Sequence, residues 1–178
     1  RTFQNLQIFS RMTVVENVMA GRHLREQRGL ISHLLHLPAA RAQERLTRES
    51  AMRFLARVHL SADADRIAGS LPYGAMKRLE IARALATEPR LLLLDEPAAG
   101  CNSTETEEID RLLVEIADDG IAVVLIEHDM KLVMGISNRI LVLDQGRVLA
   151  EGLPGEVAVD PRVVAAYLGA AARPASAV

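Results

Sequence analysis

The apolar residues in the first half of the chain recur with the period of an α-helix. In residues 41–58 they fall at i, i+3, i+4 and i+7, which predicts a helix with one buried face, formed by Ala51, Phe54, Leu55 and Val58. Thr13-Val14-Val15-Glu16 has the Thr-x-x-Glu pattern of a capping box, so another helix is predicted to begin near Thr13. A third is predicted over residues 74–87. Residues 13–88 are therefore expected to be mainly helical.

The second half of the chain alternates between apolar runs and amphipathic stretches. Residues 91–94 and 121–126 are continuous apolar runs, and each predicts a strand that is buried on both faces. Between them a capping box is predicted at Thr104-x-x-Glu107, followed by a helical stripe of Ile109, Leu112, Leu113 and Ile116. This strand–helix–strand order predicts a βαβ unit and a parallel sheet.

The C-terminal part predicts a hairpin and a helix. Two apolar segments, 140–143 and 148–149, flank the turn sequence Asp144-Gln145-Gly146, which is typical of a β-hairpin. Asp160-Pro161 precedes a helix that is predicted to reach about Leu168. The small residues of 170–178 predict a disordered tail.

Composition narrows the class of protein. The 178 residues include 21 basic and 23 acidic side chains, a net charge of −2, which argues against a mainly electrostatic nucleic-acid binder. A hydrophobic content of 49% with 25% charged residues is that of a folded globular protein. Cys101 is the single cysteine, so no internal disulfide can form. Only two of the basic residues are lysines, Lys77 and Lys131.

Two of the predicted strands end in polar residues that are typical of nucleotide chemistry. Asp95 and Glu96 follow the first strand, where the first carboxylate can hold Mg²⁺ and the second can polarise an attacking water. His128 follows the second strand by two residues and is expected at the same edge of the sheet. Taken alone, an acidic turn and a surface histidine explain these residues as well.

Two further segments carry weaker signals. Residues 71–75 lead into a helix through Gly74, and a glycine at a helix start lets the backbone approach an anion such as phosphate. Gln4, in the segment 1–5, can ligate Mg²⁺ or hold a water if it ends a strand. Each segment alone is explained at least as well by an ordinary loop.

Together these motifs resemble those of the ATP-binding subunit of an ABC transporter. They are, in chain order, Gln4, residues 71–75, Asp95-Glu96, residues 98–102 and His128. In that family they are the Q-loop, the signature, the Walker B strand, the D-loop and the switch histidine. The match looks closest to the branched-chain amino-acid importers of bacteria and runs from residue 1 to about 169, through the segments 1–5, 79–83, 95–100, 160–161 and 166–169.

The resemblance implies an α/β fold of the P-loop NTPase type, with a mostly parallel sheet and a helical subdomain. It implies one partial ABC ATPase domain over 1–178, in which 13–88 form the helical subdomain, 89–169 the sheet core and 170–178 a tail. ATP and Mg²⁺ are the implied cofactors. The implied partners are a second ATP-binding subunit, identical or different, and transmembrane permease subunits. The protein would then lie peripherally at the cytoplasmic face of the inner membrane and energise amino-acid import.

The same resemblance assigns roles to individual residues. Glu96 would act as general base or water-positioner and His128 would contact the γ-phosphate, while Gln4 and Asp95 would serve Mg²⁺. The nucleotide-binding set would comprise Gln4, Leu71, Pro72, Tyr73, Gly74, Ala75, Asp95, Gly100 and Asn102.

The chain departs from the family pattern at several points. A Walker A loop needs Gly-Lys-Ser/Thr, but both lysines are preceded by methionine. We therefore expect that the sequence begins just before the Q-loop of a longer protein and that the fragment alone is inactive. In the signature, Pro72 replaces serine and Ala75 replaces glutamine, which leaves backbone N–H groups around Gly74 as the expected phosphate donors. Asn102 replaces the aspartate of many relatives.

Two other interpretations remain open from the sequence. The first is a soluble ATPase of the same superfamily, of the kind that serves DNA repair or translation. The second is a non-catalytic subunit that only docks on a partner. The presence of both Glu96 and His128 favours a catalytic parent protein over the second interpretation.

Overall fold

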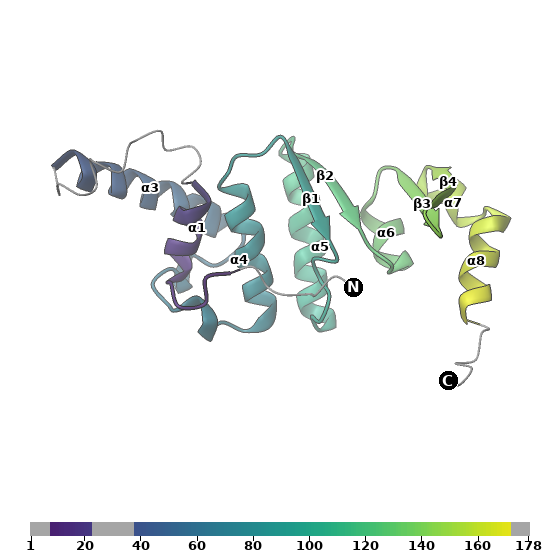
Figure 1. Cartoon of the computed structure of the whole chain (residues 1–178), viewed down its shortest axis with the longest axis horizontal. Helices are drawn as coiled ribbons and strands as arrows, with labels where there is room; N and C mark the ends of the chain where they lie inside the picture. The colour runs from purple at the N-terminus through teal and green to yellow at the C-terminus, as the bar shows by residue number, and fades with distance from the viewer. Residues whose placement is uncertain (1–7, 23–37, 172–178) are drawn as a thin grey trace. The chain divides into compact units, whose positions relative to one another are not determined.

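A computed structural model describes residues 8–22 and 38–171 of the chain (Figure 1). The chain forms two compact units, Arg1–Ile126 and Glu127–Val178. Their boundary falls inside the stretch 89–169 that the sequence assigns to the sheet core.

Three helices build the first part of the first unit: α1 (Val14–Arg22), α3 (Pro38–Arg57) and α4 (Tyr73–Leu85). They pack on one another around aliphatic side chains that are almost completely buried, among them Val14, Val18, Ala51, Leu55, Val58, Leu79 and Leu85. The stripe predicted for α3 is thus confirmed, although Phe54 is only half-buried. Two short 3-10 turns, η2 (Ser61–Asp63) and η3 (Ala68–Ser70), lead from α3 to α4.

The predicted capping box at the start of α1 is present. The amide of Thr13 donates to Oε2 of Glu16 at 2.7 Å, and the amide of Glu16 donates to Oγ1 of Thr13 at 3.3 Å. These bonds satisfy two N–H groups that the first turn of a helix otherwise leaves without a partner, so the helix begins where the sequence predicts it.

A buried asparagine ties the segment before α1 to that helix. Asn17 is completely buried, and its Oδ1 accepts from the amide of Phe9 at 2.8 Å. Its Nδ2 donates to the carbonyl oxygens of Phe9 at 3.0 Å and Thr13 at 2.9 Å. The ring of Phe9 also lies 5.3 Å from the guanidinium carbon of Arg83 on α4. Residue 9 is therefore held to two helices.

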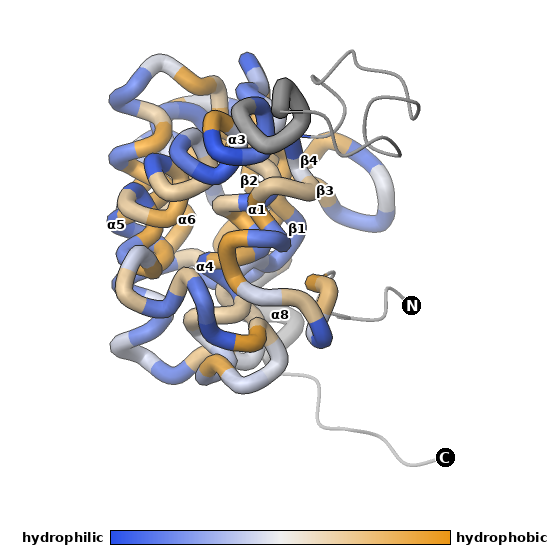
Figure 2. Tube along the Cα trace, turned by 90° about the vertical axis from the view of Figure 1, so that its left-hand side faces the viewer, coloured by the Kyte–Doolittle hydropathy of each residue, from blue (hydrophilic) through white to orange (hydrophobic). Residues whose placement is uncertain are grey.

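The predicted βαβ unit follows. Strands β1 (Leu91–Asp95) and β2 (Ala122–Ile126) are parallel, in register from Leu91 opposite Ala122 to Asp95 opposite Ile126. They are connected through α5 (Ser103–Asp118), which carries both hydrophilic and hydrophobic residues (Figure 2). The predicted α5 stripe is confirmed, because Ile109, Leu112, Leu113 and Ile116 are all at most 3% exposed.

The prediction that both strands are buried on two faces is wrong for the described part of the chain. Leu92 is 5% exposed, whereas its neighbour Leu93 is 69% exposed. Val124 and Ile126 on β2 are likewise 47% and 61% exposed. Successive side chains of a strand point to opposite faces, and α5 packs against the sheet, so the other face is left open.

The second unit contains α6 (Met130–Ile136), β3 (Ile140–Asp144), β4 (Arg147–Gly152), α7 (Pro154–Ala158) and α8 (Pro161–Ala171). Its core is formed by Ile140 of β3, Ala150 of β4, Val157 of α7 and Val163 of α8. Helix α8 runs to Ala171, past the predicted end near Leu168 and into the first two residues of the predicted tail; residues 172–178 lie outside the described ones.

The predicted hairpin is confirmed. β3 and β4 pair antiparallel, with Asp144 opposite Arg147, so Gln145 and Gly146 form a two-residue turn. Both turn residues have positive φ, 46° and 78°, as a type I′ turn requires. Glycine adopts this conformation without a steric penalty, which explains the Gln-Gly sequence at this point.

Candidate functional site

Asp95 and Glu96 lie at the carboxyl end of β1, where ligands of parallel sheets bind. Asp95 is exposed at the edge of the sheet opposite Ile126. The amide of Glu96 donates to the carbonyl of Ile126 at 3.0 Å, and its carbonyl accepts from the amide of Ala99 at 3.1 Å. The backbone of Glu96 is left-handed, with φ at 47°. Left-handed non-glycine residues concentrate at functional sites, which makes this turn a candidate site on structural grounds.

The carboxylate of Asp95 fits the chemistry of a Mg²⁺ ligand. Mg²⁺ in nucleotide enzymes takes one or two carboxylates together with phosphate oxygens and water, so a single exposed carboxylate at a strand edge suffices on the protein side. Among residues 8–22 and 38–171, no cluster of three or more histidine, cysteine or acidic side chains forms a self-contained metal site. Gln4, the other predicted Mg²⁺ ligand, lies outside the described residues.

His128 belongs to the second unit. Its side chain is 79% exposed, and its Nδ1 lies 3.9 Å from Oε2 of Glu127. Its amide donates to that same oxygen at 3.3 Å. The following residue, Asp129, caps α6 by accepting from the amides of Lys131 and Leu132. In the sequence, His128 follows Ile126, the last residue of β2, by two residues.

The signature residues 71–75 form the junction between η3 and α4. Leu71 and Ala75 are buried at 4% and 8% exposure, so their side chains belong to the core. Pro72 is the N-cap of α4 and makes no side-chain cap hydrogen bond. The amide of Gly74 donates to Oε1 of Glu105 at 3.1 Å. One of the backbone donors expected to face a phosphate is therefore already engaged by a carboxylate of the chain itself.

The D-loop residues lie against the signature. Gly100 has φ at 82°, and a Cβ placed on it would lie 3.2 Å from Cε1 of Tyr73. Asn102 is the N-cap of α5: its Oδ1 accepts from the amide of Glu105 at 3.0 Å, and Oε2 of Glu105 accepts from the amide of Asn102 at 3.1 Å. The capping box thus begins at Asn102, and the predicted box at Thr104-x-x-Glu107 is wrong by two residues. Asparagine with an extended backbone is as good a cap as threonine.

Sequence reasoning missed the contacts of four side chains at this junction. Glu105 hydrogen-bonds both α4 and α5, and Arg78 forms an ion pair with Glu108 between the same helices. Lys77 is 8% exposed, with its Nζ 5.9 Å from the centre of the Tyr73 ring. The sequence signal that could have identified the role of Glu105 was the capping-box pattern Asn102-x-x-Glu105.

The neighbouring cysteine has the character of a packed residue. Burial and, to a smaller extent, the charge of Glu105 raise the pKa of the Cys101 thiol.

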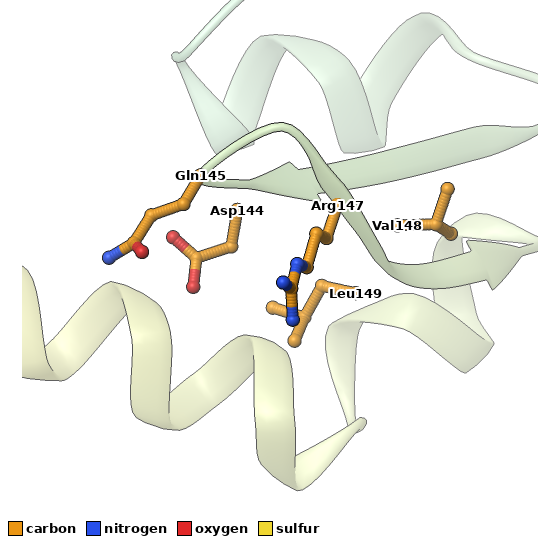
Figure 3. A pocket seen from close by; sticks show the side chains of 5 residues that line it. All are labelled: Asp144, Gln145, Arg147, Val148 and Leu149. Atoms are coloured by element: carbon orange, nitrogen blue, oxygen red, sulfur yellow. The ribbon is translucent and has the colours of Figure 1, made fainter.

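A separate hollow lies beside the turn of the β3–β4 hairpin. It is lined by Asp144, Gln145, Arg147, Val148 and Leu149 (Figure 3). None of the residues predicted to bind nucleotide lines it. Within the described ranges, no helix has the length and apolar character needed to cross a bilayer.

Comparison with known proteins agrees with these observations. The model of the ABC transporter family matches residues 1–99, and that of the branched-chain amino acid ATP-binding cassette transporters matches residues 147–173. LivG of Salmonella typhimurium, a high-affinity branched-chain amino acid transport ATP-binding protein, is 48% identical over 172 residues. That alignment covers 96% of this chain and 68% of LivG.

Solved structures agree as well. The ADP conformation of MJ1267, an ATP-binding cassette of an ABC transporter, gives a TM-score of 0.73 at 32% identity, over 94% of this chain and 66% of that one. The dimeric cassette MJ0796 gives 0.65 at 28% identity, over 85% of this chain and 61% of that one. The chain thus spans about two thirds of the length of its relatives.

The fold, the motifs and these matches define an ATP-binding cassette, the class of transport-coupled ATPases with a P-loop NTPase fold. The chain belongs to the ABC transporter family, and within it resembles the ATP-binding proteins of branched-chain amino-acid transport. The predicted family and fold class are confirmed.

Proposed function

We propose that the full-length product of the gene containing this chain is the ATP-hydrolysing subunit of an importer for branched-chain amino acids. The observation that carries the proposal is the carboxyl end of β1, where Asp95 is the last residue of the strand and Glu96 follows it, bonded through its amide to the parallel strand β2. The likeness to LivG and the matching C-terminal family segment support the amino-acid specificity.

Each predicted catalytic or Mg²⁺-binding residue has a proposed role. Glu96 positions and deprotonates the attacking water, a contribution of roughly 10²–10⁴ in rate. Asp95, together with Gln4, holds Mg²⁺, which neutralises phosphate charge when bound. His128, on an exposed turn after β2, donates to the γ-phosphate. The left-handed backbone of Glu96 supports this assignment, because it turns the chain sharply just where the strand ends.

The remaining predicted residues belong to the face that meets a second ATP-binding subunit. There the signature and the D-loop would close over the nucleotide held by the partner, with the side chains of Leu71 and Ala75 remaining in the core and only their backbone near the face. The other residues of the set are Pro72, Tyr73, Gly74, Gly100 and Asn102. The dimeric state of MJ0796 supports such an arrangement. The partner is a second copy or a different ATP-binding subunit. Permease subunits would hold the pair at the cytoplasmic face of the inner membrane, and 1–178 would be one partial domain of the whole protein.

The decisive experiment measures ATP turnover by the full-length product with Glu96→Gln. We expect binding of ATP to persist, turnover to fall about 10²–10⁴-fold, and the dimer to accumulate, because only the proton acceptor is lost. Glu107→Gln, an exposed glutamate on α5, is the matched control and should keep wild-type turnover. Turnover of Glu96→Gln near the wild-type rate would show that Glu96 is not the base.

The chain of 178 residues has its own test. It contains no Gly-Lys-Ser/Thr sequence to cradle the phosphates, so we propose that this chain alone binds ATP weakly and does not hydrolyse it. Titration with ATP, followed by calorimetry, measures the affinity directly. A dissociation constant in the micromolar range would refute this part of the proposal.

A further inference from the structure

Helices α4 and α5 begin side by side, and one carboxylate lies between their N-termini. Oε1 of Glu105 accepts from the amide of Gly74 on α4, and Oε2 accepts from the amide of Asn102 at the start of α5, both at 3.1 Å. Each helix N-terminus carries about half a positive charge, so two such ends repel each other. The carboxylate of Glu105 offsets both charges at once.

The glycine at position 74 is explained by this contact. A Cβ on Gly74 would lie 2.6 Å from Cγ, Cδ and Oε1 of Glu105, which is closer than atoms of two side chains approach. The N-cap of α4, Pro72, brings no hydroxyl, and no side-chain cap bond is made there. Glu105 therefore supplies, from 31 residues away in the sequence, an acceptor that a capping serine would supply locally.

Two further contacts connect α4 with the D-loop and with α5. The ring of Tyr73 lies against Gly100, whose positive φ of 82° and lack of a side chain leave room for it. Arg78, one turn beyond the start of α4, forms an ion pair with Glu108 on α5. These contacts join the signature to the D-loop within one subunit.

We propose that Glu105 is a positioning residue that makes the signature and the D-loop move as one rigid joint. This inference rests on the proposed function, in which both segments face the nucleotide of a partner subunit. Glu105 itself touches no nucleotide. It sets the direction of the first turn of α4, and through Asn102 that of the D-loop, so that one closure movement brings both to the partner.

The first experiment uses the 178-residue chain and asks whether the joint exists. Glutamine at position 105 retains one acceptor oxygen but replaces the other by an NH₂ donor, so it can satisfy only one of the two amides. We expect hydrogen exchange of the Gly74 or the Asn102 amide to rise about tenfold in Glu105→Gln, a loss expected for one hydrogen bond to a charged group. Glu107→Gln on the same helix should leave both rates unchanged, and unchanged rates in Glu105→Gln would overturn the joint.

A second test, which does not depend on hydrogen exchange, compares the effect of Gly74→Ala on the melting temperature in two backgrounds. Gly74→Ala alone should lower the melting temperature, because the new Cβ collides with Glu105. In a Glu105→Ala background the same substitution should raise the melting temperature by about 2–4 °C, since alanine is the better helix former and the obstacle is gone. If Gly74→Ala has the same sign in both backgrounds, the contact is refuted.

The second experiment asks whether the joint positions the signature. In the full-length product carrying Glu96→Gln, we expect Glu105→Gln to weaken ATP-dependent dimerisation about tenfold while ATP affinity of the monomer stays within twofold. A merely destabilised subunit would change both, and stronger dimerisation would show that the carboxylate competes with phosphate instead of positioning the helix. If the Glu96→Gln protein itself fails to dimerise with ATP, the proposed function is refuted, whereas the exchange rates still decide the joint.

Discussion

Two adjacent leucines of β1 should respond to the same substitution by very different amounts. Leu92 is 5% exposed, whereas Leu93 points to the opposite, open face and is 69% exposed. Truncating a buried leucine to alanine removes transfer energy and leaves a cavity, so Leu92→Ala should lower the free energy of unfolding of the 178-residue chain by about 3 kcal/mol. Leu93 keeps most of its surface in water, and Leu93→Ala should change the same quantity by less than about 1 kcal/mol.

The measurement is urea unfolding of both variants, followed by circular dichroism and compared at equal m-value. In the full-length product we expect the difference between the two variants to shrink, because a continuous run of four leucines is typical of a strand that is covered on both faces. Equal losses of unfolding free energy for the two variants of the 178-residue chain would refute the conclusion that one face of the sheet is open. A difference that persists undiminished in the full-length product would refute the idea that this face becomes covered.

Three other substitutions test separate features. Asn17→Ala removes two hydrogen bonds to Phe9 and one to Thr13, so the free energy of unfolding should fall by about 3 kcal/mol, seen as a melting temperature lower by about 6–12 °C. His128→Ala in the full-length product should lower ATP turnover with nucleotide affinity nearly unchanged, and a large loss of affinity would contradict its role. Hydrogen bonds from Arg162 lower the pKa of Asp160 from 3.8 to about 2. The stabilisation of α8 by the Asp160 carboxylate is therefore present above about pH 4 and lost as the pH falls towards 2. In an NMR acid titration, Asp160→Asn should abolish the transition of the α8 signals over this range.

Periodic features of this fold were predictable because they are local. The stripes of α3 and α5 repeat every three to four residues, and the Gln145-Gly146 turn marks the hairpin within two residues. Helix α7 was not predicted: it has five residues, too few for a period to appear. Five family motifs in the expected order identify the family much more specifically than any single motif does. The ATP-binding cassette could therefore be recognised from the sequence alone.

Other features depend on pairings that no local pattern contains. Glu105 meets Gly74 across 31 residues, and nothing near Gly74 indicates that its amide already has an acceptor. The prediction that β1 is buried on both faces failed for a different reason. An apolar run shows that both faces of a strand can be buried, but it does not show which elements cover them in this chain. The predicted capping box failed in register because two overlapping patterns, Asn-x-x-Glu and Thr-x-x-Glu, start two residues apart.

The left-handed backbone of Glu96 has a consequence for engineering the stability of this protein. A left-handed residue with a side chain carries a penalty of about 1–2 kcal/mol that glycine at the same position avoids. Glu96→Gly should therefore make the cassette more heat-resistant while removing the carboxylate from the end of β1. Laboratory selection for thermal tolerance alone would converge on glycine here, whereas the proposed role of Glu96 in ATP hydrolysis predicts that a selection for transport would retain the acid.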